Sequence, residues 1–374
     1  MEWKTVKLGE VCNLLTGFPF KGNLYAKDGI RVLRGENIGD KELHFDGRND
    51  KRWNLPFDKI EQYSLREGDI VMQMDGNVGK NKARLLHDDI PMLIAQRVAC
   101  LREKEGISNQ RYLYFVITGT PFHQYLDSVK TGTSIQHISL KQIGDFELPL
   151  PPLDTQRRIV AILSSLDDKI ENNNRINRNL EAQAQALFKS WFVDFEPWGG
   201  TMPEDWKEGT LGEIAHVTSG KRPPLKQSLC SADINIPLIG AADIMGYTNS
   251  VLYTTPILVT GRVGTHGIVQ RFNEPCWPSD NTLVVEGKWY EYIYQTMCRI
   301  DYHNMNRGST QPLITQTDLK NQKVIIPNVS ILDKFETQVT ILYKQVYINQ
   351  RENQRLAKLR DTLLPKLMKG EIAL

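Results

Sequence analysis

Two segments of the chain carry apolar residues at alternating spacings of four and three. The first begins at Ile159 and reaches Trp191, and the second lies 176 residues later, from Phe335 to Leu367. Neither segment has an interior glycine, and the only interior proline is Pro365. This 3.5-residue period predicts one long coiled-coil helix in each segment. A helix over 155–195 would be roughly 60 Å long at 1.5 Å per residue.

Four asparagines interrupt the apolar period. If the two helices pair antiparallel about a common centre, facing residue numbers add up to 526, so that Asn173 faces Asn353 and Asn177 faces Asn349. Two facing asparagines can bond each other, whereas an asparagine against an apolar residue leaves its amide unsatisfied. We therefore predict that these four residues fix the helix register. The alternative is that they face solvent or a partner chain.

The same register has one irregular position. It puts Arg360 opposite Leu166, in the apolar seam. An arginine there would have to extend its charged end toward solvent, or it would mark a place where another chain packs.

The chain also contains an internal repeat. Trp3-Lys4 and Leu8-Gly9-Glu10 near the start return as Trp206-Lys207 and Leu211-Gly212-Glu213. In mid-domain, Asn77-Val78-Gly79 is matched with Arg262-Val263-Gly264, and from Gly132 and Gly308 onward the two halves correspond with a constant offset of 176. A repeat of this kind predicts two copies of one structural unit.

Between these helices, short runs rich in β-branched residues are separated by Gly, Pro and Asn turns. The runs predict strands at 69–72, 98–101, 236–239 and 282–285, with helical stretches at 110–126 and 290–304. The fold class is therefore α+β: two similar α/β domains at opposite ends of a pair of long antiparallel coiled-coil helices, related by a pseudo-twofold repeat. The predicted boundaries are 1–151 for the first domain, 152–199 for the central helix, 200–326 for the second domain and 327–374 for the C-terminal helix.

Composition narrows the class of protein. The chain has 374 residues, 24% charged and 40% hydrophobic, with a net charge of +2, so any DNA-binding surface must be a local patch. No apolar run is long enough to span a bilayer and no signal peptide is evident, which predicts a cytoplasmic protein. Five cysteines without a C-x-x-C pair predict buried thiols instead of disulfides or zinc ligands.

Motifs for catalysis are missing from the sequence. It has no phosphate-binding loop, dinucleotide fingerprint, H-E-x-x-H or G-x-S-x-G, and both Pro-Pro pairs are followed by leucine, unlike an adenine methyltransferase tetrad. We expect no metal, no cofactor and no catalytic residue, and hence a non-enzyme. The alternative is a freestanding metal-dependent nuclease, suggested by acid-x-Lys triplets such as Glu286-x-Lys288.

Several loops combine glycine with Arg, Lys, Asn, Gln or His, which suits the reading of DNA bases. Glycine allows close backbone approach, arginine pairs with guanine, and Asn or Gln with adenine. Two similar domains held at a fixed separation also suit duplex DNA, whose half-sites recur with the helical turn. The predicted DNA-binding residues are Arg34, Asn37, Asn77, Lys80, Lys82, Arg97, Thr133, Gln136, His137, Arg222, Arg262, His266, Asn281, Thr310 and Gln311.

Three stretches of the chain resemble a known family. They are Gly132-Thr133-Ser134-x-Gln136-x-Ile138, then Leu148-Pro149-Leu150-Pro151-Pro152-Leu153-x-x-Gln156 with its long helix, and Leu363-Leu364-Pro365-Lys366-Leu367 near the C-terminus. Together with the domain-opening Trp-x4-Leu-Gly-Glu motif, they resemble the specificity subunit of type I restriction-modification systems over nearly the whole chain. The second helix entry, Ile326-Pro327-Asn328-Val329, departs from the motif by lacking Pro-Pro-Leu and the glutamine.

The resemblance implies function and partners. Each globular domain would be a target-recognition domain that reads one half of a bipartite, asymmetric site in double-stranded DNA. The helices would set the spacer and bind two modification (methyltransferase) subunits, to which restriction (translocase and nuclease) subunits are added, and the subunit itself would be non-catalytic. A different class is also compatible with the repeat and the near-neutral charge: a scaffold whose paired domains hold two copies of a protein ligand.

Overall fold

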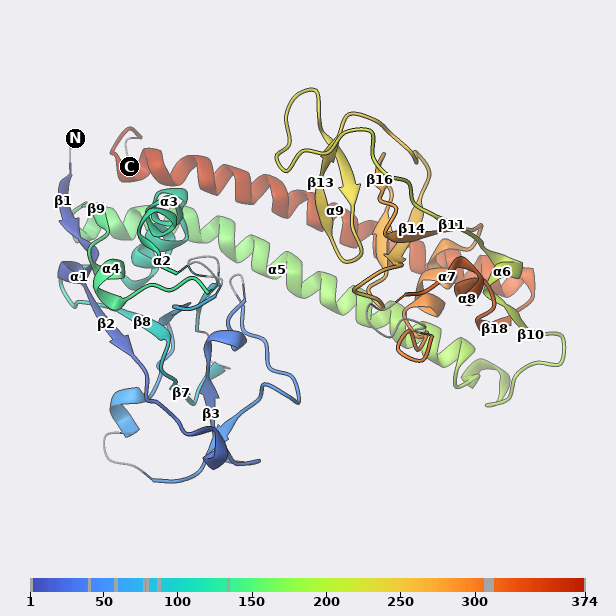
Figure 1. Ribbon diagram of the computed structural model, residues 1–374, viewed down its shortest axis with the longest axis horizontal. Helices are drawn as coiled ribbons and strands as arrows, with labels where there is room; N and C mark the ends of the chain where they lie inside the picture. Colours follow the sequence, from blue (N-terminus) through green and yellow to red (C-terminus); the bar gives the residue numbers. More distant parts are fainter. Residues whose placement is uncertain are drawn as a thin grey trace. The chain divides into compact units, whose positions relative to one another are not determined.

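The computed structural model describes residues 3–39, 42–56, 60–76, 78, 81–85, 89–132, 135–305 and 313–372. The chain forms two compact units: unit 1 is Met1–Asn172 with Glu352–Leu374, and unit 2 is Asn173–Arg351. The division passes through both long helices, α5 (Leu153–Phe192) and α9 (Val329–Met368), which are labelled in Figure 1. Each unit therefore contains globular elements together with its own share of both helices, whereas the predicted boundaries treated the helices as separate segments.

The described residues of unit 1 form three small sheets. The four-stranded antiparallel sheet has the order β2 (Cys12–Thr16), β8 (Val98–Glu103), β5 (Ile70–Gln73), β6 (Lys82–Arg84). The three-stranded sheet has the order β4 (Arg52–Trp53), β3 (Ile30–Leu33), β7 (Met92–Ile94), with β3 and β7 parallel. A two-stranded sheet joins β1 (Lys4–Lys7) to β9 (Glu147–Leu150), just before α5 begins.

The helices of unit 1 differ in part from the sequence prediction. They are α1 (Leu8–Val11), α2 (Gln110–Thr118), α3 (Thr120–Val129) and α4 (Leu140–Gly144). The single helical stretch predicted at 110–126 is two helices, because Gly119 has extended backbone angles and Pro121 lies in the first turn of α3. Both helices pack into the same core as the first turns of α5 and the last turns of α9.

The Pro-Pro-Leu-x-x-Gln motif has a structural role at the start of α5. The Gln156 side chain is fully buried, and its Oε1 accepts from the backbone N–H of Asn109 at 2.9 Å. Its Nε2 donates to the carbonyls of Ile107 at 3.1 Å and Pro151 at 2.9 Å. Asn109 in turn caps α2 by accepting from two backbone N–H groups. One buried amide thus joins the starts of α2 and α5.

Unit 2 repeats this topology strand for strand. The four-stranded sheet has the order β11 (His216–Ser219), β17 (Thr282–Glu286), β14 (Ile257–Gly261), β15 (Gln270–Phe272). The three-stranded sheet has the order β13 (Ile244–Thr248), β12 (Ile236–Ile239), β16 (Trp277–Pro278). The two-stranded sheet joins β10 (Lys207–Thr210) to β18 (Lys323–Ile326). Its short helices are α6 (Leu211–Ile214), α7 (Tyr290–Met297) and α8 (Gln316–Lys320). The helix predicted at 290–304 ends at Met297. The predicted repeat and the α+β fold class are confirmed.

The strand ladders correct one part of the repeat alignment. Val98 on β8 pairs with Gln73, and the equivalent Thr282 on β17 pairs with Gly261. The offset between the two mid-domain strands is therefore 188 and not 185, so the match of Asn77-Val78-Gly79 with Arg262-Val263-Gly264 is wrong by three residues. Short glycine-containing strings recur by chance, whereas ladder partners fix each position.

Matching backbone hydrogen bonds support the corrected alignment. The N–H of Met74 donates to the carbonyl of Arg97 at 3.0 Å, and the N–H of Arg262 donates to that of Asn281 at 2.8 Å. In the same way Ile138 donates to Met74, and Ile314 to Arg262, each at 3.0 Å. Arg262 therefore occupies in unit 2 the position of Met74 in unit 1.

Within each unit the shares of α5 and α9 run antiparallel. In unit 2, the Nδ2 of Asn349 donates to the Oδ1 of Asn177 at 2.8 Å, and both side chains are buried. Their numbers add up to 526, the register derived from the sequence. Closer to the start of α9, the Phe335 ring lies 5.0 Å from the ring of Phe192.

In unit 1, the irregular position Arg360 has a partner within the same unit. Its side chain is 11% exposed, and its Nη1 donates to the Oδ1 of Asp167 at 2.7 Å. The expectation that Arg360 must reach solvent or meet another chain is wrong, because Asp167 supplies a carboxylate one residue beyond Leu166.

Two further expectations concern the whole chain. Cys12, Cys100 and Cys276 are buried as predicted, but Cys230 and Cys298 are exposed. Among the described residues, no helix is both long enough and apolar enough to cross a bilayer.

Candidate functional site: polar turns beside the central strands

The structure brings three of the predicted residues of unit 1 together. Arg97 ends the turn between β7 and β8, while Gln136 and His137 end the loop that follows α3. The loop after β5 joins them, because the N–H of Gly76 donates to the carbonyl of Gln136 at 2.8 Å and Asp75 forms a β-bridge with His137. Three loops that are distant in sequence thus meet at the end of the four-stranded sheet.

Side chains hold this cluster in one arrangement. The carboxylate of Asp75 accepts from Nδ1 of His137, and its Oδ2 lies 3.6 Å from Nε of Arg97. The Nη1 of Arg97 lies 3.3 Å from Nε2 of His137. All three groups are satisfied when the ring proton is on Nδ1 and Nε2 accepts from the guanidinium. The Arg97 side chain remains 58% exposed.

Unit 2 has a related but different surface. Arg262 is half-buried and Asn281 is exposed, and the backbone of Arg262 is bonded to that of Asn281. Arg222 is exposed in the loop after β11, where the preceding Lys221 donates its N–H to the carbonyl of Pro278 at 3.0 Å. Gly220 permits this approach, since a Cβ there would lie 2.2 Å from the carbonyl oxygen of Ser279.

His266 lies in the loop that follows β14 and is half-buried. Burial lowers the pKa of His266, which favours the neutral ring. The residue is therefore suited to packing and hydrogen bonding, and less to attracting phosphate as a cation.

Three predicted residues are engaged inside unit 1. Asn37 is fully buried; its Oδ1 accepts from the N–H of Arg34 at 3.0 Å, and its Nδ2 donates to two carbonyls at 3.2 Å. Arg34 forms an ion pair with Glu36 and donates to the carbonyl of Asn49. Lys82 is 1% exposed, with its Nζ 5.4 Å from the centre of the Phe122 ring.

For Asn37 and Lys82 this placement corrects the expectation of DNA contact, since a buried side chain with protein partners is not presented to a ligand. Residue type alone favoured exposure for both. The remaining predicted residues, Asn77, Lys80, Thr133, Thr310 and Gln311, lie outside the described residues.

One residue of the cluster was not among the predicted DNA-binding residues. Asp75 stands in a loop that the sequence singles out, but an acidic side chain is not expected to approach DNA phosphates. The feature of the sequence that could have pointed to Asp75 is its position directly before Gly76, at the end of a buried strand. Its role as the common partner of Arg97 and His137 depends on tertiary structure.

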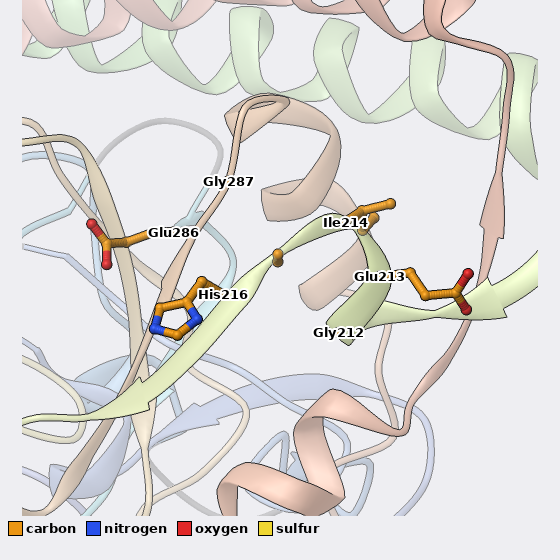
Figure 2. A pocket seen from close by; sticks show the side chains of 7 residues that line it. Gly212, Glu213, Ile214, His216, Glu286 and Gly287 are labelled. Carbon is orange, nitrogen blue, oxygen red and sulfur yellow. The ribbon is translucent and has the colours of Figure 1, made fainter.

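A separate hollow lies in unit 2, seen in Figure 2. It is lined by Gly212, Glu213, Ile214, Ala215, His216, Glu286 and Gly287. Figure 2 shows His216 and Glu286 on neighbouring strands, where they are ladder partners, while Glu213 lies on the other side. Glu213 is engaged by Nζ of Lys207 at 2.6 Å and by the N–H of Thr210. None of the predicted DNA-binding residues lines this hollow.

The described residues thus form a two-domain protein with two copies of one fold and different polar residues on equivalent turns. The family model for the type I restriction modification DNA specificity domain matches residues 1–182 and again 203–358. The chain belongs to this family of type I restriction-modification specificity subunits, which are the non-catalytic components of these systems.

Two relatives agree with this assignment, and a solved structure shares the fold. The chain is 26% identical to the type I restriction enzyme MjaIX specificity subunit of Methanocaldococcus jannaschii, over 99% of this chain and 94% of the relative. It is 22% identical to the HindI specificity subunit of Haemophilus influenzae, over 99% and 100%. In fold it is similar to the crystal structure of the S subunit of a type I restriction-modification system from M. genitalium, with a TM-score of 0.57, 18% identity and coverage of 98% and 96%.

Proposed function

We propose that this specificity subunit reads a bipartite, asymmetric site in double-stranded DNA, each unit reading one half. The observation that carries the proposal is that the two units repeat one topology with different side chains on the equivalent turns. A protein with two identical readers would favour a symmetric site, whereas Arg97 in unit 1 and Asn281 in unit 2 present different chemistry.

The proposed role of α5 and α9 is to set the spacer between the half-sites and to bind two methyltransferase subunits. Restriction subunits would join that complex. The buried pair Asn177 and Asn349 supports the spacer role, because a register fixed by paired amides keeps a constant length between elements attached to the two helices. The DNA contacts proposed are Arg97, Gln136 and His137 in unit 1, and Arg222, Arg262, His266 and Asn281 in unit 2.

The test is a selection of binders from a random duplex library, using the chain purified with the methyltransferase subunit of its own system. We expect two conserved blocks separated by a fixed gap of indifferent sequence, with enrichment that falls steeply at higher salt because phosphate contacts release counterions. A single contiguous motif would contradict two readers. Absence of any motif from a folded complex would instead favour a scaffold that holds two protein ligands.

A further inference from the structure

We propose that the turn entering the central strand of each four-stranded sheet presents one base-reading side chain: Arg97 reads a guanine in the first half-site, and Asn281 reads an adenine in the second. This inference rests on the proposed function and adds to it the identity of two bases. It is carried by the equivalence of the two turns and by the way in which Arg97 is held.

The two turns connect equivalent strands, although of their last residues only Arg97 has a positive φ. Each connects the parallel edge strand of the three-stranded sheet, β7 or β16, to the central strand of the four-stranded sheet, β8 or β17. The last residue of each turn, Arg97 or Asn281, uses its carbonyl to accept from the strand alongside. Its backbone is therefore fixed toward the sheet, while its side chain is exposed.

The backbone of Arg97 is in an uncommon conformation. Its φ is +68°, in the left-handed region, where a side chain costs about 1 kcal/mol or more relative to the right-handed region. Glycine or asparagine would occupy this position at lower cost. A long cation in such a position, held there by the surrounding loops, points to a requirement for its guanidinium.

The surroundings of the guanidinium favour a base edge over a phosphate. Asp75 lies 3.6 Å from Nε of Arg97, and a carboxylate this close both balances the positive charge and repels an approaching phosphate. His137 occupies one side of Nη1. Among the described residues, Nη2 has no hydrogen-bond acceptor, so both terminal nitrogens still have N–H groups to donate. Guanine offers O6 and N7, two neutral acceptors that match a pair of parallel donors.

Asn281 lies at the end of the equivalent turn in unit 2 and offers different hydrogen-bonding groups from Arg97. Its amide offers one donor and one acceptor, which match N7 and N6 of adenine. The residues of unit 2 that correspond to Asp75 and His137 are Val263 and Leu313, as their β-bridge shows. Neither has a charged or ring nitrogen group to orient a guanidinium, which agrees with a shorter neutral reader in this unit.

The experiment compares variants in the same complex with the methyltransferase subunit, by the same library selection. Arg97→Ala is expected to lose about tenfold or more of the preference at one guanine in one half-site, with the other positions unchanged. Arg97→Gln is expected to move that preference toward adenine. Lys7→Ala is the matched control, because Lys7 is also an exposed cation paired with a carboxylate in unit 1, but it lies on β1.

Asn281→Ala is expected to relax one adenine in the other half-site by a similar factor, and Asn281→Arg to convert that adenine to guanine. Asn235→Ala, at an exposed asparagine of the same unit, is the control. Asp75→Asn tests positioning: it should weaken discrimination at the guanine read by Arg97 and leave the second half-site intact.

The outcomes separate this inference from the proposed function. If the unaltered complex selects no bipartite site, the proposed function fails. If it selects one and the variants of both turns leave every base preference unchanged, the inference alone is overturned. A uniform loss of affinity across sequences in Arg97→Ala, with a shallower salt dependence, would identify a phosphate contact and would also overturn it.

Discussion

The two units have the same strand order but differ in the side chains that meet at the end of the four-stranded sheet. The hydrogen bonds that shape this region are backbone bonds, and they recur at equivalent positions in both units. Because such bonds do not depend on residue type, the side chains around them can change without loss of the sheet. Where unit 1 has Asp75, Arg97 and His137, unit 2 has Val263, Asn281 and Leu313.

The polar contacts inside the two units are alike at one position and differ at the position before it. Tyr112 of α2 donates its hydroxyl to the carbonyl of Pro149, and Tyr292 of α7 donates to that of Ile325. The residue before each tyrosine has a different role. Arg111 forms an ion pair near the surface, whereas Glu291 is 5% exposed. Equal folds are thus stabilised by different polar interactions, and this difference can be measured.

The largest effect is expected from Glu291→Gln. The Glu291 carboxylate bonds both terminal nitrogens of Arg271, at 2.5 and 2.7 Å, and Arg271 is 16% exposed. Removal of the carboxylate leaves a buried cation without its partner and should lower the stability of unit 2 by about 3–5 kcal/mol. Arg111→Gln in unit 1 should cost less than about 1 kcal/mol. Hydrogen exchange resolved by peptide measures each unit separately, and equal losses would contradict the comparison.

A smaller loss of stability, in unit 1, is expected from Gln156→Leu. The corresponding residue of unit 2 is Leu332, which is fully buried in an apolar core. In unit 1 the same leucine would leave the N–H of Asn109 and the carbonyls of Ile107 and Pro151 without their partner, at about 2–3 kcal/mol in total. Faster exchange at the starts of α2 and α5, with unit 2 unaffected, is the expected readout. Protection equal to the unaltered chain would show that other groups satisfy these atoms.

Asn177→Leu is expected to have an effect of about 1–2 kcal/mol, because it leaves the Nδ2 of Asn349 without its buried acceptor. The double variant with Asn349→Leu should recover stability but lose register specificity. A double-mutant cycle gives the coupling energy, and library selection gives the gap between half-sites. A coupling near zero together with an unchanged gap would count against a register role for this pair.

The smallest effect is a pH dependence confined to unit 2. Burial, with the nearby charge of Glu291, raises the pKa of Glu336 to about 7, from 4.5. Between these values the native state holds a proton that the unfolded state has released, so stability falls as pH rises through this window. The equivalent residue in unit 1 is Val160, which cannot titrate.

Glu336→Gln should remove this contribution, so that the unfolding midpoint of unit 2 varies by roughly a few degrees less between pH 5 and 7. Unfolding followed by exchange at the two pH values checks it. An identical pH slope in the Gln variant would show that another group is responsible.

The sequence predicted the long helices best. Apolar spacing placed the first over 155–195, and it spans Leu153–Phe192. Periodicity works there because each residue of a paired helix either faces its partner or does not. The parallel pairing of β3 with β7 could not be predicted, since it joins segments about sixty residues apart and leaves no local pattern.

The candidate site was only partly predictable. Arg97, Gln136 and His137 were recognised from loop composition, and the structure brings them together. The burial of Asn37 and Lys82 was missed. Asn37 satisfies backbone groups inside a turn and Lys82 lies on β6 over the Phe122 ring, but both residue types also occur where a side chain faces a ligand. Only the fold distinguishes the two cases.

The division of the chain has a consequence for its synthesis on the ribosome. Unit 2 is one continuous stretch, Asn173–Arg351, and all of its residues are available before the rest of α9 is made. Unit 1 needs Glu352–Leu374 as well, since Leu364 and Leu367 pack in the same core as Ile159 and Leu163. The unit translated first is therefore completed last, and its apolar helix face stays uncovered until the final turns of α9 emerge.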